Sequence, residues 1–349
     1  MYIHKSVCIS PQHTFPAVNF EEVMPSADNK LNAIEPKHEN IPLNTLRRMG
    51  KAVRMGVGAS INLILEYPDL NGIIIGTANG GMEDCIKFLN QIIDYNEGTL
   101  TPKNFVQSTT NAIAAQIGLI AHNTGYNITH VHRGLAFENA LLDAMMLIKE
   151  NPNNVYLLGG GDEISTYNFN LENLGGWYKE EITSNENLYS ANTIGSIAGE
   201  GVAMFIVNDK SKDAIAKVKA IKLLHTSDSS EVTEQMQLFL KNNLSPGQQI
   251  DLFLTGENGD SRLNHFYNSC EALLPQITVA RFKHLSGEYP TTSAFALWLS
   301  CYLLEEQKLP AHILKTAYNK NTVNTILIYN NNRGSQHGFI LVEKFPLRE

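Results

Sequence analysis

The stretch AGEGVAMFIVND, residues 198–209, decides the fold. A glycine-containing turn leads into a continuous run of apolar residues that does not alternate with polar positions. Such a run predicts a strand that is buried on both faces, as in sheets covered by helices on either side. The stretch SQHGFILVEKF, residues 335–345, repeats the order of a glycine turn followed by a short apolar strand. We therefore predict two related halves, residues 1–210 and 211–349, packed into one compact unit.

Short apolar runs alternate with segments of helical periodicity along the whole chain. The predicted strands cover residues 2–9, 72–76, 128–131, 154–158, 202–207, 215–223, 250–255, 277–280, 323–329 and 338–342. The predicted helices cover residues 42–67, 82–94, 108–122, 135–149, 261–272 and 291–305, and one more helix follows a capping box at Asp228 and Glu231. This alternation is typical of α/β proteins with largely parallel strands.

Composition and charge exclude several classes of protein. The 349 residues include 43% hydrophobic and 18% charged residues, which is the composition of a globular chain. There are 27 Lys and Arg against 35 Asp and Glu, so the net charge is −8. Because nucleic-acid binding depends on neutralising phosphates, an acidic chain without a basic run argues against it. The longest apolar stretch, Phe295–Leu304, is far shorter than the ~20 residues of a membrane span.

The first residues of the chain and its cysteines indicate in which cellular compartment the protein is expected. The first residues, MYIHKSVCIS, contain no apolar core and no cleavage site of a secretion signal. The four cysteines are isolated from one another: Cys8, Cys85, Cys270 and Cys301. No C-x-x-C pair exists, so we expect neither a zinc knuckle nor a redox dithiol. The sequence therefore predicts a reduced, cytoplasmic location.

Standard short motifs of enzymes do not occur. The chain contains no phosphate-binding P-loop, no dinucleotide-binding G-x-G-x-x-G, no H-E-x-x-H and no G-x-S-x-G. The glycines of Gly159–Gly161 follow a predicted strand and indicate a tight turn there. His130 and His132 lie two apart on a predicted strand and so point to one face. Without a third ligand nearby in sequence we predict no metal site, and we expect no cofactor.

Six segments, taken in order, resemble the ketoacyl synthases of the thiolase fold. They are SPQHTF (10–15), LRRMGKAVRM (46–55), QSTTNAIAAQIGL (107–119), LLGGGDE (157–163), AGEGVAMFIV (198–207) and FKHLSGEYPTTSAFALWL (282–299). The resemblance covers nearly the whole chain. It implies an α/β thiolase fold with two pseudo-repeated halves in a layered α-β-α-β-α sandwich. The chain looks closest to ketosynthase-like proteins of aryl polyene or flexirubin-type pigment clusters.

The resemblance also indicates that the family's catalytic residues are replaced. The family's nucleophilic cysteine, at a sharp turn before a buried helix, corresponds to Gly134, or to Arg133 if the register slips by one. The first family histidine corresponds to Glu257. The second, five residues after the motif lysine, corresponds to Glu288, whereas that lysine is retained as Lys283. The family's glycine-rich segment near the carboxyl terminus corresponds to the bulkier, more polar NNNRGSQHG (330–338).

These replacements remove the groups that condensation needs. A thiolate must carry the acyl group, and two neutral imidazoles must promote decarboxylation and stabilise the developing oxyanion. A glutamate at either imidazole position places negative charge where negative charge must develop. The resemblance therefore implies that this chain does not perform decarboxylative condensation by the family's route.

Three functions fit this pattern. The first is a catalytically silent subunit, similar to chain length factors, which pairs with an active ketosynthase or a second copy and shapes the acyl tunnel. Residues 108–122, nearly uncharged, would then be either a subunit interface or a core helix. The second is an acyltransferase or 3-oxoacyl-carrier-protein synthase-type enzyme with altered chemistry, using His132 or Glu257 as general base, so enzyme status stays open.

The third function is a binding module for an acyl chain carried on acyl carrier protein. Because carrier proteins are acidic, docking needs a local basic patch. Arg47, Arg48, Lys51 and Arg54 fall within one predicted helix and are either that patch or a solvated face.

Overall fold

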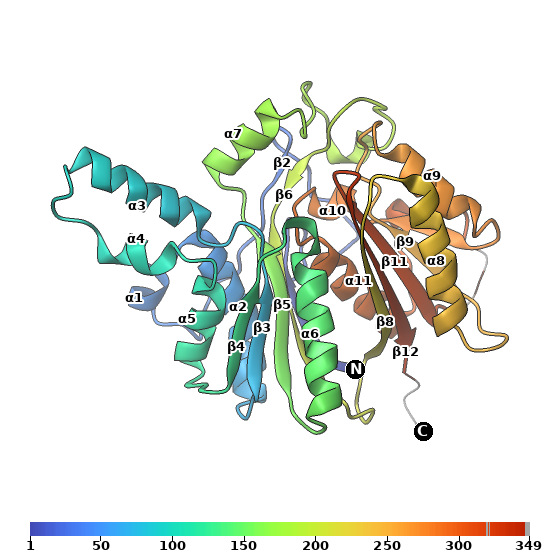
Figure 1. The fold of residues 1–349 in the computed structure, drawn as a ribbon, viewed down its shortest axis with the longest axis horizontal. Coiled ribbons are helices and arrows are strands. Elements are labelled where there is room, and N and C mark those ends of the chain that lie inside the picture. Colours follow the sequence, from blue (N-terminus) through green and yellow to red (C-terminus); the bar gives the residue numbers. More distant parts are fainter. Residues whose placement is uncertain (319, 321, 346–349) are drawn as a thin grey trace.

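A computed structural model describes residues 1–318, 320 and 322–345 and contains one ten-stranded mixed sheet, shown in Figure 1. Its strands are β1 (Tyr2–Ile9), β3 (Gly72–Gly76), β4 (Tyr126–His130), β5 (Tyr156–Asp162), β7 (Gly201–Asn208), β8 (Ala216–His225), β9 (Leu252–Thr255), β10 (Thr278–Arg281), β11 (Thr325–Asn332) and β12 (Gln336–Lys344). Two short strands, β2 (Lys30–Leu31) and β6 (Ala198–Gly199), pair separately.

The sheet consists of two halves with the same strand order. The first half runs β4-β3-β5-β7-β1 and the second runs β10-β9-β11-β12-β8. In each half the first strand in sequence pairs antiparallel with the last strand, and the three outermost strands are parallel to one another. The two stretches that echo each other in sequence become β7 and β12, which hold the same place in their halves. The halves join through β1 and β8, at Tyr2–Lys217 and Ile3–Ala216.

Helices cover both faces of each half and form three layers. The central layer contains α6 (Ala136–Glu150) and α11 (Ser293–Glu306), which pack against strands of both halves. The outer layers contain α2 (Lys51–Glu66) and α5 (Ala112–Ile120) on the first half, and α8 (Ser229–Asn243) and α9 (Asn264–Ala272) near the second. This α/β architecture is the predicted thiolase fold.

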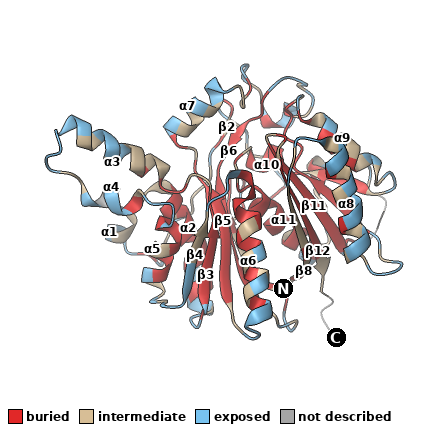
Figure 2. Ribbon diagram, in the orientation of Figure 1, coloured by how far each residue is buried: buried red, intermediate tan, exposed pale blue. Residues whose placement is uncertain are grey.

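Successive side chains along a strand point to opposite faces of the sheet and therefore pack against different helix layers. On β3, Ile74 packs in the core around α6 and α11, whereas Ile73 and Ile75 pack in the core around α2 and α5. Strands β3, β5 and β7 therefore bury both faces, which explains their continuous apolar sequences, whereas β4 and β8 are partly exposed. Helix α11 is buried over most of its length and apolar around its whole circumference, as expected for a helix between two layers. Figure 2 shows the buried sheet and central helices against exposed outer faces.

The remaining helices lie around the carboxyl ends of the strands or at the periphery. They are α1 (Leu43–Leu46), α3 (Met82–Asp94), α4 (Pro102–Gln107), α7 (Thr166–Leu174) and α10 (Lys283–Ser286), with 3₁₀ turns η1 (Arg133–Leu135), η2 (Asn185–Asn187) and η3 (Ala311–Ile313). Among the described residues, none of the helices combines the length and the apolar character that crossing a membrane requires.

Two sequence-based expectations were wrong. The glycines Gly159–Gly161 do not form a turn but continue β5 as far as Asp162. A Cβ atom on Gly159 or Gly160 would overlap Met204 or Phe137 respectively, so these glycines admit large side chains from neighbouring elements. The single helix expected over residues 42–67 is interrupted, because α1 ends at Leu46 and α2 begins after Gly50.

Candidate functional site

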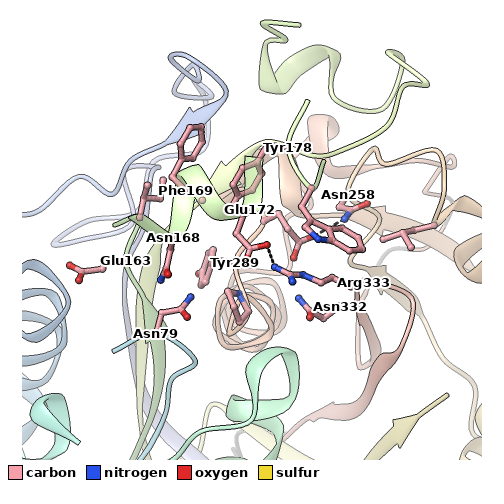
Figure 3. Close-up of a pocket in the computed structure, with 16 residues that line it drawn as sticks. Asn79, Glu163, Asn168, Phe169, Glu172, Tyr178, Asn258, Tyr289, Asn332 and Arg333 are labelled. Carbon is pink, nitrogen blue, oxygen red and sulfur yellow. Dashed lines mark hydrogen bonds and ion pairs between the residues drawn. The ribbon is translucent and has the colours of Figure 1, made fainter. Parts of the chain in front are cut away.

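A small pocket opens where the carboxyl ends of strands from both halves meet (Figure 3). Its lining comes from the segment after β5, from α7, from the loops after β9 and α10, and from the end of β11 with its turn. Ligands commonly bind at the carboxyl ends of strands in α/β sheets. The cavity encloses about 50 Å³. Ligand pockets for molecules of drug size hold roughly 300–1,000 Å³, so this one admits only a small group.

Gly134, the predicted nucleophile position, is buried in η1 at the start of the central helix α6. Its N–H donates a hydrogen bond to Oε1 of Gln336 at 3.0 Å. A Cβ atom at Gly134 would overlap the Cβ and Cγ atoms of Asn332. Because these atoms lie near the backbone, any side chain at position 134 requires the β11–β12 turn to shift. The preceding Arg133 has φ +47°, in the left-handed region, so the turn is also tight.

Lys283 is bonded to Glu288, which lines the pocket. Lys283 is fully buried, and its Nζ donates to Oε2 of Glu288 at 2.7 Å. Asn258 Nδ2 donates to the same oxygen at 2.7 Å. Burial lowers the pKa of Lys283, and the Glu288 carboxylate acts in the opposite direction. Glu288 and Asn258 both line the pocket, and together with Lys283 they form one bonded cluster that contains no imidazole.

Glu257 does not line the pocket. Its carboxylate accepts from Nζ of Lys315 at 2.6 Å and from Nη1 of Arg281 at 3.3 Å. The adjacent Asn258 faces the pocket instead, because successive side chains after β9 point in different directions.

A buried glutamate lies behind the cluster. Glu138 on α6 is fully buried, and neither carboxylate oxygen has a hydrogen-bond partner among the described residues. Burial raises the pKa of Glu138 to about 7, while the Lys283 ammonium acts against this rise. A Cβ atom on Gly338 would lie 2.7 Å from Oε1 of Glu138, so only glycine fits beside this carboxyl group without a shift.

The two histidines considered as metal ligands lie on the flank of α6. His130 Nε2 is 2.9 Å from Oδ2 of Asp143, and His132 Nδ1 is 3.1 Å from Nδ2 of Asn139. Neither histidine lines the pocket. Among the described residues, no group of three or more metal-ligating side chains comes together.

The basic residues proposed as a carrier-docking patch do not lie on one helix. Arg47 and Arg48 precede α2, which starts at Lys51. Nζ of Lys51 is paired with the fully buried Glu200. Arg54 is held by Glu35 through two hydrogen bonds of 2.6 Å. Internal carboxylates therefore offset two of the four positive charges.

Sequence reasoning did not name several residues of the site. Asn168 and Glu172 lie on α7, where the sequence analysis predicted no helix. Arg333 and Asn332 fall within the segment compared with the family's glycine-rich loop, and Arg333 pairs with Glu172. The one signal that could have indicated a role for Asn332 and Arg333 was their position after a predicted strand, since strand ends in α/β sheets gather at one edge.

Comparison with known proteins identifies the class of fold. Residues 22–169 match the family described as beta-ketoacyl synthase, N-terminal domain. A crystal structure of a beta-ketoacyl synthase from Burkholderia phymatum STM815 superposes with TM-score 0.78 at 14% identity, covering 99% of each chain. No curated protein sequence matches this chain significantly.

Two further structures relate the fold to polyketide assembly. One is the ishigamide ketosynthase/chain length factor, with TM-score 0.76, 13% identity and 99% of each chain covered. The other is a type II polyketide ketosynthase in complex with its acyl-carrier protein, with TM-score 0.76, 11% identity and 98% of each chain covered. The chain therefore has a ketosynthase-like thiolase fold over its whole length.

Proposed function

We propose that this chain is a catalytically silent ketosynthase-like subunit that pairs with an active beta-ketoacyl synthase and helps to shape the acyl tunnel of that partner. The observation that carries the proposal is Gly134 at the start of the central helix, with its space occupied by Asn332. No thiol stands there, and the four cysteines lie elsewhere in the chain. We infer a cytoplasmic pathway of the aryl polyene type, in agreement with the sequence resemblance.

The charge of the pocket supports the same function. Condensation requires groups that stabilise a developing oxyanion. The pocket instead contains the Glu288 carboxylate, fixed by Lys283 and Asn258. A fixed negative charge raises the energy of an oxyanion formed beside it. His132 and Glu257, the bases considered for altered chemistry, do not line the pocket, and the Glu257 carboxylate is paired with Arg281 and Lys315.

An unpaired sheet edge supports assembly with a partner. Strand β4 ends the sheet, and among the described residues no strand pairs with its outer side. Exposed unpaired edges are usually protected or used for association. Large apolar side chains surround this edge and are 37% to 70% exposed: Leu119, Tyr126, Val131, Leu142 and Met146. Helix α5, considered as a possible interface, is mostly buried against α2, and of its large apolar side chains Leu119 is the exposed one.

Mixing this chain with acyl-loaded carrier protein is expected to leave it without a covalent acyl group. The physical reason is that the position at the start of α6 has no nucleophile. Intact-mass spectrometry of both partners after mixing checks this, with an active cysteine-containing ketosynthase as the positive control. An acyl adduct on this chain, under conditions that label the control, contradicts the proposal.

Val131→Glu is expected to weaken association with the partner subunit, or with a second copy, at least tenfold. Burying an unpaired carboxylate in an interface costs more than the ~1.4 kcal/mol that a tenfold change in affinity represents. Light scattering and copurification with a ketosynthase of the same gene cluster measure the effect. Leu174→Glu, at an 86% exposed leucine on α7, is the matched control. Equal association of both variants and the wild type contradicts an interface at β4.

A further inference from the structure

A second and much larger groove lies beside the carboxyl end of α7. This α7 groove is lined by Asn173 and Leu174, by parts of residues 176–183, by residues 191–194 and by Ser261. It encloses about 910 Å³, near the upper end of the ~300–1,000 Å³ of ligand sites, so several side chains of one segment fit there. Figure 1 shows α7 and the loop that follows it at the top of the molecule, away from β4.

Buried polar side chains fix the walls of the α7 groove. Asn29, which is 6% exposed, donates through Nδ2 to the carbonyl oxygens of Lys179 and Glu181 at 2.8 and 3.0 Å. Its Oδ1 accepts from the N–H of Thr183 at 2.8 Å. Nζ of the buried Lys179 donates to Oγ1 of Thr193 at 2.9 Å, which ties the two wall segments together. The groove is therefore preformed, so a ligand loses little free energy in ordering it.

Exposed apolar side chains surround the α7 groove. Leu174 and Ile194 line it and are 86% and 55% exposed. Leu171 lies one turn before Leu174 on α7 and is 66% exposed, and Ile182 lies between two lining residues and is 79% exposed. Leu174 and Ile182 have the largest exposed fractions among the large apolar side chains that the structure describes. Covering such a cluster releases water from apolar surface and so favours association with a partner.

The α7 groove is also acidic. Glu180 and Glu181 line it, and both are exposed. Among the described residues, no Lys or Arg belongs to the lining, and neither carboxylate takes part in an ion pair. The Lys179 ammonium between them is directed toward Thr193 and is buried. Because like charges repel across an interface, an acidic carrier protein does not suit this groove, whereas a basic segment does.

We propose that the α7 groove binds a short segment of a partner protein in which Lys or Arg side chains stand beside apolar ones. The basic side chains pair with Glu180 and Glu181, and the apolar side chains cover Leu174 and Ile194. A wholly apolar segment would remove water from two unpaired carboxylates, and a wholly basic one would leave the apolar cluster in water. This partner is distinct from the ketosynthase proposed at β4, so the inference goes beyond the proposed function.

The first part of the test uses the full chain and a fluorescein-labelled peptide, KLAKKLAKLAKK, in fluorescence anisotropy titrations. We expect saturable binding of this peptide, and at least tenfold weaker binding of its charge-reversed counterpart ELAEELAELAEE. Glu181→Lys is expected to weaken binding of the lysine peptide about tenfold. Glu186→Lys is the matched control, because it reverses an exposed carboxylate of the same loop that does not line the groove.

The second part of the test examines the apolar contribution. Ile194→Ala is expected to weaken binding of the lysine peptide about fivefold, because it removes methylene and methyl groups that the peptide covers. Leu65→Ala, at a 63% exposed leucine on α2, is the control and should bind like the wild type. Circular dichroism checks that each variant is folded.

Three results overturn the inference. They are no saturable binding to the folded wild type, equal weakening by Glu181→Lys and Glu186→Lys, and binding of the glutamate peptide as tight as that of the lysine peptide. A second copy of this chain in the groove would appear in sedimentation as a dimer that Glu181→Lys dissociates, and this result also contradicts a basic partner. None of these results bears on the Val131→Glu experiment or on the absence of an acyl adduct, so failure here is separable from failure of the proposed function.

Discussion

Glu138→Gln is expected to change the free energy of unfolding differently at two pH values. The change is about 3 kcal/mol more favourable to the folded state at pH 8 than at pH 4.5. Burial raises the pKa of Glu138 to about 7 in the folded chain, against an ordinary value of 4.5. Between pH 4.5 and about pH 7, the Glu138 carboxyl group is protonated in the folded state and ionised in the unfolded state. The free energy of unfolding of the wild type therefore falls as the pH rises from about 4.5 to about 7. Glutamine does not titrate, so this part of the slope disappears.

Urea denaturation at several pH values measures this difference. Glu163, whose pKa burial also raises to about 7, contributes a similar slope that stays in the variant, and Glu138→Gln with Glu163→Gln removes both. Glu306→Gln, at an exposed position near the end of α11, is the control and should leave the slope unchanged. Parallel pH profiles for wild type and Glu138→Gln would show that Glu138 is not titrating as a buried carboxyl group.

Asp162→Ala is expected to lower the free energy of unfolding by about 4 kcal/mol. Asp162 ends β5, is 1% exposed and accepts four hydrogen bonds. Its Oδ1 accepts from the Thr77 hydroxyl at 2.9 Å and from the N–H groups of Ala78 and Asn79 at 2.9 and 2.8 Å. Its Oδ2 accepts from the Thr291 hydroxyl at 2.7 Å. Alanine leaves these donors without a partner in a site that excludes water.

The cost is large because Asp162 joins the two halves of the fold. The Thr77–Asn79 turn follows β3 in the first half, whereas Thr291 precedes α11 in the second. Chemical denaturation measures the loss, and Asp162→Asn is the matched control. Its carbonyl oxygen still accepts at the Oδ1 position, so a loss of only about 1–2 kcal/mol is expected. A loss below 1 kcal/mol for Asp162→Ala, or equal losses for both variants, contradicts this role.

The proposed function depends on a small part of the fold. Gly134 lies at the start of α6, at the position that the sequence resemblance gives to the family's nucleophile, and Asn332 occupies the adjoining space. At the pocket, Glu288 accepts hydrogen bonds from Lys283 and Asn258. The functional proposal therefore depends on few atoms, which the adduct experiment tests directly.

Part of this arrangement was predictable from sequence. Short apolar runs predicted the ten strands of the main sheet, with ends shifted by a few residues, and several of these runs are continuous because burial on both faces requires apolar residues. The echo between residues 199–209 and 335–345 predicted the repeat of β7 and β12. The capping prediction at Asp228 was confirmed in part: Asp228 accepts from the Ser230 N–H, but Glu231 accepts from the Thr226 hydroxyl and does not close the box.

Other features depended on contacts between distant parts of the chain. The glycines of β5 were read as a turn, because local preference favours turns and nothing nearby in sequence reveals that Met204 and Phe137 fill the space above them. The sequence comparison assigned Glu257 to the position of the first family histidine, and only the packing after β9 shows that Asn258 lines the pocket and Glu257 does not.

By itself, then, the sequence determined the alternation of strands and helices and the lack of a thiol at the start of α6. These are properties of local pattern and residue identity, which each segment carries independently. Only the tertiary structure decided that Asn332 closes the space at Gly134, that Asn258 reaches Glu288, and that Glu138 is buried without a partner. The physical reason is that each of these results from packing between segments far apart in the chain, which fixes side-chain direction and access to water.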